Sequence, residues 1–325
     1  ILILSLVRLV AGLWVLGAAV PAILALFGFA VPFLDLFNHL QFLLFWGTVT
    51  GVVLAIVLAL PRVWIGVALI GFVASCWTYL PEWASSLAPR PSRGDATVLK
   101  LMTHNIFGLN YDMQRLADAI AAEKPDIVAL QEYFPQQAAE LGRLLEPTYP
   151  YAVHCFGGKR ANLALYSRLP FKTEMSAADC PATAFGTQRT AHILVGFTLA
   201  DGTQFSVMTT HMDWPYPIAR QQAEFRTAID VVKNTTGPLI LVGDFNSTPW
   251  SYALRQFESD SGLRRETRNL ITYPMLFTLG DLVHTWPFLA LDQVFERGVA
   301  VHELHRGGET GSDHLPVIFS FSIPN

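Results

Sequence analysis

The first 93 residues of the sequence contain very few charged side chains. They are limited to Arg8, Asp35, Arg62, Glu82, Arg90 and Arg93. From Asp95 onward, charged residues are distributed as in an ordinary globular domain. A water-soluble domain carries about a quarter of its residues as charged side chains, so the first part does not have the composition of one. The two parts of the chain therefore require different solvents.

Cysteine is also scarce, with three residues in 325. Cys76, Cys155 and Cys180 show neither a CxxC pair nor the spacing of metal ligands, which gives no support to a cysteine-based metal site. Cys155 and Cys180 either form a disulfide, which requires an oxidising compartment, or remain free buried thiols. The sequence leaves both states open.

Long uncharged runs occupy the part that lacks charge. Residues 9–34 and 36–61 are uncharged runs of 26 residues each, and residues 63–81 form a run of 19. About 20 residues of helix cross the hydrocarbon core of a bilayer, where a helix satisfies its own backbone hydrogen bonds. We expect three transmembrane helices. A signal peptide is the alternative for the first run, but the two further runs favour a membrane span.

The few basic residues near these runs predict the membrane topology. Arg8 and Arg62 lie on one side of the three spans, and the loop around Asp35 has no Lys or Arg. The positive-inside rule makes the side of Arg8 and Arg62 cytoplasmic and everything after Glu82 extracytoplasmic. Arg90 and Arg93 oppose this assignment. We expect a multi-pass membrane protein with an extracytoplasmic C-terminal domain.

A Pro- and Ser-rich stretch at residues 82–97 predicts a linker between a membrane domain at 1–81 and a second domain at 98–325. In the second domain, short apolar runs predict strands, Asp112 and Pro217 begin predicted helices, and Asp201-Gly202 predicts a hairpin turn. Hairpins mixed with helical crossovers predict a two-sheet α/β sandwich. The expected strands are 98–103, 127–130, 163–166, 193–199, 205–209, 239–242 and 316–321.

Charge in the second domain limits its partners. Acidic residues outnumber basic residues after position 94. Proteins that bind a nucleic-acid backbone usually present a basic face, because phosphate contacts dominate that affinity. The balance disfavours bulk nucleic acid as a partner.

Polar residues recur at the ends of the predicted strands. Such side chains can converge at one edge of a sandwich while the apolar strands hold them rigidly. Hydrolysis of a phosphate ester requires a cation for the phosphoryl oxygens and a group that orients water. Carboxylates and amides suit Mg²⁺, with Mn²⁺ as the alternative ion, whereas zinc takes more His or Cys. These residues are Asn105, Glu132, His211, Asp244, Asn246, Asp292, Asp313 and His314.

Seven motifs containing these residues occur in a consistent order: HNI at 104–106, LQE at 130–132, NLALYSRLP at 162–170, TTHMD at 209–213, GDFN at 243–246, LDQVF at 291–295 and SDHLPV at 312–317. Together they resemble the endonuclease/exonuclease/phosphatase superfamily over residues 98–321. The apolar N-terminal part resembles that of bacterial membrane-tethered members, which places the protein in a bacterial inner membrane. The resemblance implies a deoxyribonuclease-I-like fold and a Mg²⁺-dependent phosphoric ester hydrolase.

The resemblance also implies residue roles. Glu132 would be the principal Mg²⁺ ligand beside Asn105, with Asp313 close to the metal. Asp244 would orient or activate water or serve the leaving group, and Asn246 would hold the phosphate. His314, oriented by Asp292, and His211 would face the phosphoryl group. Taken singly, each Asn, Asp and His has a structural alternative as a turn, cap or surface residue.

The sequence departs from the family pattern before the SRLP motif. In many nuclease members an acidic residue there supports the histidine equivalent to His211, but residues 149–167 contain no Asp or Glu. His154, Lys159, Arg160 and Asn162 are candidates to bind the substrate instead. Trp214 and Trp286 are candidates for an aromatic wall near the leaving group, with ordinary packing as the alternative.

Three functions remain open from the sequence. The first is a phosphatase or phosphodiesterase that acts on a lipid-linked or envelope-derived phosphate ester, with membrane lipid nearby. The second is a membrane-tethered nuclease. The third is an inactive membrane-bound interaction module, which the complete polar set disfavours.

Overall fold

The computed structural model describes residues 2–92, 96–157, 162–175, 179–180, 191–275 and 286–324. The chain forms two compact units. The first, here called the helical unit, comprises Ile1–Ala88 together with Ser247–Gln256. The second, called the sandwich unit, comprises Pro89–Asn246 and Phe257–Asn325. Lys159 and Arg160 lie outside the described residues.

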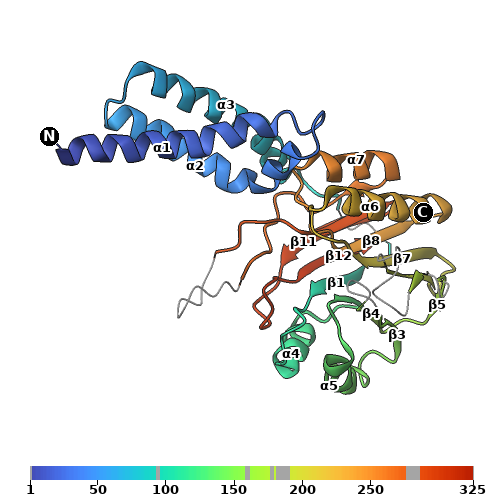
Figure 1. Ribbon diagram of the computed structural model, residues 1–325. Helices are drawn as coiled ribbons and strands as arrows, with labels where there is room; N and C mark the ends of the chain where they lie inside the picture. Colours follow the sequence, from blue (N-terminus) through green and yellow to red (C-terminus); the bar gives the residue numbers. More distant parts are fainter. Residues whose placement is uncertain are drawn as a thin grey trace. The chain divides into compact units, whose positions relative to one another are not determined.

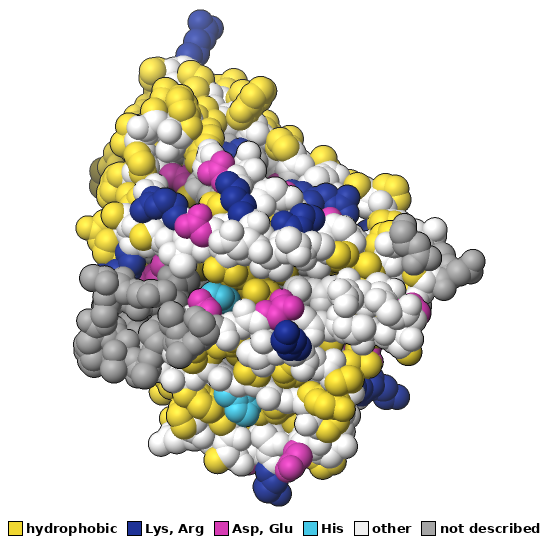
Figure 2. Space-filling model, turned by 90° about the vertical axis from the view of Figure 1, so that its right-hand side faces the viewer, with side chains coloured by type: hydrophobic (Ala, Val, Ile, Leu, Met, Phe, Trp, Pro, Cys, Tyr) yellow, Lys and Arg dark blue, Asp and Glu magenta, His cyan; other side chains and the backbone are white. Residues whose placement is uncertain are grey.

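The helical unit contains three long apolar helices that are candidate membrane spans. They are α1 (Leu2–Ala25), α2 (Gln41–Val57), which is extended at its start by the 3₁₀ helix η1 (Leu34–Leu40), and α3 (Arg62–Ser85). Large hydrophobic side chains are exposed along all three, and hydrophobic side chains dominate the upper part of Figure 2. Helix α3 continues past Pro81 to Ser85 and so includes the first residues of the predicted linker.

The sandwich unit is built from two six-stranded mixed sheets, with the strand orders β11-β12-β1-β2-β4-β3 and β5-β6-β7-β8-β10-β9. This confirms the predicted two-sheet α/β sandwich (Figure 1). The strands are β1 (Leu99–Asn105), β2 (Ile127–Gln131), β3 (Tyr151–Cys155), β4 (Leu163–Ser167), β5 (Phe171–Thr173), β6 (His192–Thr198), β7 (Gln204–His211), β8 (Leu239–Asp244), β9 (Arg264–Arg265), β10 (Asp292–Arg297), β11 (Ala300–Arg306) and β12 (Val317–Ser322).

Alternation along the strands divides the core into layers. Leu101 of β1 packs into the core between the sheets with Val242 and Phe319, while its neighbour Met102 packs on the other face with Leu116. Successive side chains of a strand point to opposite faces, so one strand contributes to both layers. Helices α4 (Met113–Glu123) and α5 (Pro135–Leu145) cover the outer face of the β1 sheet (Figure 1).

Local signals place the remaining elements. Asp112 caps α4 by accepting a hydrogen bond from the Arg115 N–H, and Pro217 precedes α6 (Ile218–Asn234), as predicted. The Asp201-Gly202 turn joins the antiparallel strands β6 and β7. Helix α7 (Tyr252–Ser261) begins within the helical unit and ends in the sandwich unit.

Candidate active site

Five strands deliver the predicted residues to one edge of the sandwich. Strands β1 and β2 are parallel, as are β7 and β8, so the carboxyl ends of each pair lie together. These ends carry Asn105, Glu132, His211 and Asp244. Strand β10 is antiparallel to β8, and its first residue, Asp292, pairs with Asp244.

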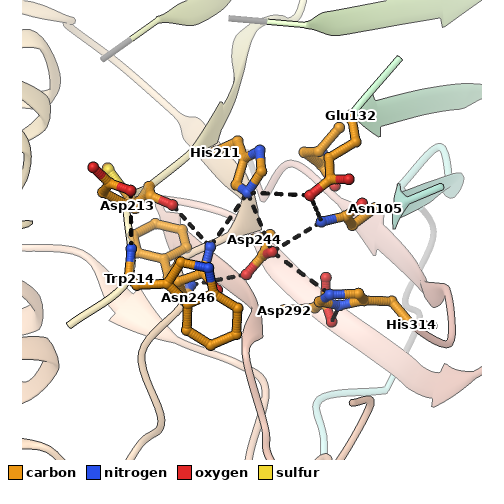
Figure 3. A network of polar contacts seen from close by, with 12 residues as sticks. Asn105, Glu132, His211, Asp213, Trp214, Asp244, Asn246, Asp292 and His314 are labelled. Atoms are coloured by element: carbon orange, nitrogen blue, oxygen red, sulfur yellow. Dashed lines mark hydrogen bonds and ion pairs between the residues drawn. The ribbon is translucent and has the colours of Figure 1, made fainter. Parts of the chain in front are cut away.

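The carboxylate of Asp244 lies at the centre of this edge (Figure 3). Its Oδ2 accepts a hydrogen bond from Asn105 Nδ2 at 3.0 Å and lies 3.4 Å from His211 Nε2 and 3.7 Å from His314 Nε2. Its Oδ1 accepts a hydrogen bond from the Asn246 N–H at 2.8 Å. The two sheets therefore meet at one carboxylate, which is 1% exposed.

A glycine allows β8 to reach this position. Gly243 has a φ of +144°, and a Cβ added there would lie 1.9 Å from the carbonyl oxygen of Thr210 on β7. Only glycine tolerates both the backbone conformation and so close an approach. This close approach explains the glycine that precedes Asp244 in the GDFN motif.

His314 is held by a buried carboxylate. Its Nδ1 donates to Asp292 Oδ2 at 2.8 Å, which turns Nε2 toward Asp244. Burial alone lowers the pKa of His314, but the charges of Asp292, Asp244 and Asp313 outweigh burial and raise the pKa to about 10. His314 is therefore an imidazolium at neutral pH in this arrangement. The hydroxyl oxygen of Ser312 accepts a hydrogen bond from the His314 backbone N–H at 3.0 Å.

Glu132 lies at the opposite side of Asn105 from Asp244. Its Oε2 accepts a hydrogen bond from the Gly108 N–H at 2.8 Å, and its Oε1 lies 3.3 Å from Asn105 Nδ2. Glu132 has a φ of +56° and Asn246 a φ of +46°. Non-glycine residues in this left-handed region are uncommon and occur often at functional sites.

Burial and neighbouring carboxylates raise the pKa values of two acidic side chains at this edge. Burial raises the pKa of Asp244 to about 7; the charge of Asp292 adds to this effect, and that of His314 opposes it. Burial, together with the charge of Glu132, raises the pKa of Asp313 to about 6, again against the charge of His314. Burial is the largest cause of both shifts, and a neighbouring carboxylate adds to each.

The side chains at this edge include oxygen atoms of the kind that hard divalent cations take as ligands. Within the described ranges, no group of three or more His, Cys, Asp or Glu side chains is arranged to hold a metal ion. Mg²⁺, however, takes only one or two protein carboxylates and keeps several waters. The amide hydrogens of Asn105 lie between the carboxylates of Glu132 and Asp244, which is where positive charge is stabilised.

Asn246 and His211 form the remaining side of the site. Asn246 Nδ2 donates to the Met212 carbonyl at 2.9 Å and lies 3.3 Å from His211 Nε2. His211 Nε2 is also 3.9 Å from Glu132 Oε1. Both side chains are almost fully buried; His211 Nε2 faces Asp244, whereas the Asn246 amide faces His211 and the Met212 carbonyl (Figure 3).

The other expected substrate-binding residues that the structure describes have different surroundings. His154 packs against aromatic rings and lies 3.1 Å from the Tyr166 hydroxyl. Asn162 is buried, and its carbonyl accepts from the Tyr133 N–H. Trp286 is 89% exposed, and no contact found among the described residues joins it to the network. Trp214 lies at the rim, with its ring 6.1 Å from that of Tyr273.

Tyr273 and Thr272 lie in the site although the sequence did not point to them. The Tyr273 ring lies 4.7 Å from the His314 ring. Burial, then the charges of Asp313, Asp244 and Glu132, raises its pKa to about 12. Thr272 Oγ1 donates to Asp292 Oδ2 at 2.5 Å. Both residues lie in the segment between β9 and β10, away from the strand ends, and no motif marks them.

The sequence of the sandwich unit matches a known family model. Residues 102–314 match the model described as "Endonuclease/Exonuclease/phosphatase family", which covers most of the sandwich unit and all of the site residues above. This chain belongs to that family. Its members are typically phosphoester hydrolases, so the chain has the fold and the family context of a hydrolase.

Individual relatives are more distant. A UPF0294 protein of Vibrio vulnificus is 29% identical over 129 residues, which cover 39% of this chain and 43% of that protein. The chain therefore spans less than half of the curated relatives that it matches. Among solved structures, the endonuclease/exonuclease/phosphatase from Bacteroides vulgatus is 21% identical with a TM-score of 0.56, covering 70% of this chain and 100% of that chain.

A second solved structure has a known ligand class. D. rerio TDP2 complexed with single-strand DNA product is 15% identical, with a TM-score of 0.54, and covers 70% of this chain and 99% of that chain. At this level of identity both solved structures establish a shared fold. They confirm the sandwich architecture expected from the motifs.

Proposed function

We propose that this protein is a membrane-anchored, divalent-metal-dependent phosphoric ester hydrolase that acts on a lipid-linked or envelope-derived phosphate. The observation that carries the proposal is the convergence of Asn105, His211 and His314 on Asp244 Oδ2. Carboxylate, amide and imidazole groups of this kind are those that phosphoryl transfer requires for positioning and charge stabilisation.

In this proposal Glu132, Asn105 and Asp313 hold Mg²⁺, with Mn²⁺ as a substitute. Bound there, the ion would supply positive charge for the phosphoryl oxygens. The Asn105 amide hydrogens lie between the carboxylates of Glu132 and Asp244, and this place for positive charge supports the assignment. Asn105 would ligate the ion through Oδ1, which accepts from the Phe107 N–H in this structure.

Four residues of the chain have the remaining roles in the proposed reaction. His314, protonated and held by Asp292, donates a hydrogen bond or a proton to the phosphoryl group through Nε2. Asp244 orients the attacking water or serves the leaving group, and the ionisation of its buried carboxylate near neutral pH suits proton transfer. Asn246 and His211 contact the phosphate oxygens from the other side.

The proposed domains are a membrane domain at residues 1–81, a linker at 82–97 and the catalytic domain at 98–325. The candidate spans support anchoring in a bacterial inner membrane. The Cys155–Cys180 disulfide, one of the two states that the sequence left open, supports an extracytoplasmic catalytic domain, because disulfides persist in oxidising compartments. An anchored site on that face favours a substrate from the membrane or envelope.

Hydrolysis of a panel of phosphate esters tests the activity. Full-length protein in detergent is assayed on p-nitrophenyl phosphate, bis-p-nitrophenyl phosphate, phosphatidic acid and prenyl phosphates, with Mg²⁺ or EDTA. We expect Mg²⁺-dependent hydrolysis that falls about a thousandfold in Asp244→Ala. Asp126→Asn is the matched control. Asp126 accepts a hydrogen bond from the Lys100 N–H beside the starts of β1 and β2, at the end of the sheet opposite to the site. Equal hydrolysis by the native protein and Asp244→Ala refutes the proposed site.

A nuclease is the second candidate, favoured by the fold shared with D. rerio TDP2. Single-stranded and duplex DNA at low salt belong in the same panel. Metal-dependent cleavage of DNA that exceeds hydrolysis of every lipid phosphate would replace the lipid substrate with a nucleic acid. The expected contribution of Lys159 and Arg160 to substrate binding stays a prediction, to be tested by Lys159→Ala and Arg160→Ala in this assay.

The proposed location has its own test. Intact cells are lysed in denaturant and labelled at once with a maleimide, either directly or after reduction. We expect Cys155 and Cys180 to react only after reduction, and Cys155→Ser to expose Cys180 without reduction. Labelling of both native thiols before reduction would place the domain in a reducing compartment.

A further inference from the structure

A short segment of the chain leaves the catalytic motif and belongs to the helical unit. Ser247–Gln256 is grouped with the three apolar helices, although residues on both sides of it belong to the sandwich unit. It begins directly after Asn246, which follows Asp244 in the GDFN motif. Whatever holds this segment also acts on the chain that leaves the proposed catalytic loop.

Asp35 holds the start of α7 within this segment. Its Oδ1 accepts a hydrogen bond from the Tyr252 N–H at 2.8 Å, and its Oδ2 accepts one from the Ala253 N–H at 3.0 Å. The first N–H groups of a helix have no partner inside the helix and carry partial positive charge, so a carboxylate stabilises them. A residue 217 positions away in the sequence thus supplies this helix cap.

Neighbours of Asp35 fix the same segment at a second point. The Thr248 N–H donates to His39 Nδ1 at 3.2 Å, two residues after Asn246. Asn38 Nδ2 donates to Asp35 Oδ1 at 2.9 Å and to the Ala25 carbonyl at 3.0 Å, which ties Asp35 to the end of α1. Asp35, Asn38 and His39 are all buried.

Apolar packing completes the attachment. Trp250, 1% exposed, stacks on Tyr79 of α3 with ring centroids 5.5 Å apart. Gly28 leaves room for Tyr252, since a Cβ there would lie 2.9 Å from Tyr252 Cδ2 and 2.9 Å from Asp35 Cα. The chain just after α1, the 3₁₀ helix η1 and the end of α3 therefore all contribute to one binding place for this segment.

A tether alone does not require these contacts. A membrane anchor needs only a hydrophobic span and a connecting linker, and neither needs a buried carboxylate. Burial of a charge is costly unless hydrogen-bond donors compensate it, and Asp35 is compensated by two backbone N–H groups of the segment itself. Such a cluster specifies the conformation of that segment.

We infer that Asp35 is a positioning residue for the reaction: the helical unit holds the chain after Asn246 and so keeps Asp244 and Asn246 in their reactive geometry. This inference rests on the proposed function. Asn246 is joined directly to this segment, and small displacements of catalytic groups by distant changes cost up to about a hundredfold in rate.

The test uses the full-length protein in lipid nanodiscs. Asp35→Ala removes both helix-capping bonds, and Asp35→Asn keeps an acceptor but removes the charge. Thr48→Val is the matched control, because Thr48 pairs with Ser75 at 2.7 Å between α2 and α3 and does not contact the segment in any described hydrogen bond. Hydrogen exchange of residues 244–256 and the kinetics of phosphate release are measured for each.

We expect exchange in residues 244–256 to increase at least about tenfold in Asp35→Ala, with Asp35→Asn intermediate and Thr48→Val unchanged. The kcat should fall roughly tenfold to a hundredfold in the same order while KM stays constant, since geometry rather than substrate binding is disturbed. Exchange in Asp35→Ala equal to that in Thr48→Val overturns the inference, and so does an unchanged kcat. If the native protein hydrolyses no substrate, the proposed function fails, and the exchange result alone decides whether Asp35 holds the segment.

Discussion

Two buried aspartates, one in each unit, show different uses of the same side chain. Asp35 is 7% exposed and Asp244 1% exposed. The carboxylate of Asp35 accepts hydrogen bonds from Asn38, Tyr252 and Ala253. The carboxylate of Asp244 accepts from Asn105 and from the Asn246 backbone, but its surroundings also include the charge of Asp292, which helps to raise its pKa.

The difference separates a carboxylate that builds structure from one prepared for chemistry. Asp35 is surrounded by donors and holds backbone in place. Burial raises the pKa values of Asp244 and Asp313; the charge of Asp292 adds to the shift of Asp244, and the charge of Glu132 adds to that of Asp313. Perturbed groups of this kind concentrate at functional sites. Replacing the carboxylate by an amide should therefore lower the free energy of unfolding at Asp35 but not at Asp244.

The largest expected effect is that of Asp244→Asn on activity. We expect kcat to fall by about a thousandfold, because the group that accepts a proton or orients water is lost. The free energy of unfolding should stay the same or rise, since desolvation and repulsion by Asp292 are relieved. Chemical denaturation of Asp244→Asn and of Asp35→Asn measures this difference, and we expect only Asp35→Asn to be destabilised. A destabilised Asp244→Asn would show that both aspartates serve structure.

Metal binding should stabilise the protein more at high pH than at low pH. The pKa values of about 7 for Asp244 and about 6 for Asp313 exceed their unfolded values, so the folded state binds extra protons and loses stability as pH rises through 6 to 7. His314 stays protonated up to pH 8, because its pKa is about 10. Mg²⁺ at 100 times its Kd should contribute about 2.7 kcal/mol at pH 8 and much less at pH 5.

Thermal unfolding with Mg²⁺ or EDTA at the two pH values measures this effect. Glu132→Gln is expected to remove most of the Mg²⁺-dependent shift, while Glu303→Gln, on β11, should leave it intact. A shift of the same size at pH 5 and pH 8 would contradict metal binding by carboxylates with raised pKa values.

Gly28→Ala tests how tightly the residues around Asp35 are packed. The added Cβ would meet Asp35, Tyr252 and Asn38 within 3.1 Å, so the segment around Asp35 must shift. We expect a loss of about 2 kcal/mol in stability, typical of overpacking. Gly17→Ala is the matched control in α1, because nothing lies within 4 Å of its added Cβ. Equal melting temperatures for both variants would mean that the contacts around Asp35 are readily rearranged.

The smallest effect is expected for Thr272→Val beside the site. The substitution keeps the side-chain shape but removes the hydrogen bond to Asp292 Oδ2, which orients the partner of His314. We expect roughly a tenfold fall in kcat with little change in KM. This is the usual scale for loss of a hydrogen bond that orients a residue of the site indirectly. Thr227→Val, on the exposed side of α6, controls for the same change of residue type. A loss limited to KM would assign Thr272 to substrate binding.

The sequence alone determined the elements and the positions of most site residues. Uncharged runs predicted the three apolar helices, and apolar runs predicted strands such as β1 and β8, because side-chain periodicity and solvent preference are local properties. Asn105 and Asp244 could be selected because polar residues at strand ends converge wherever parallel strands share an edge.

Tertiary structure decided which distant residues meet. Thr272 and Tyr273 lie beside Asp292 and His314 in a segment without periodicity, so no local pattern marked them. The pairing of Cys155 with Cys180 likewise required the path of the chain between them. The capping of α7 by Asp35 joins residues 217 positions apart. Contacts of this kind depend on how the chain closes long loops, and composition and periodicity carry no information about that closure.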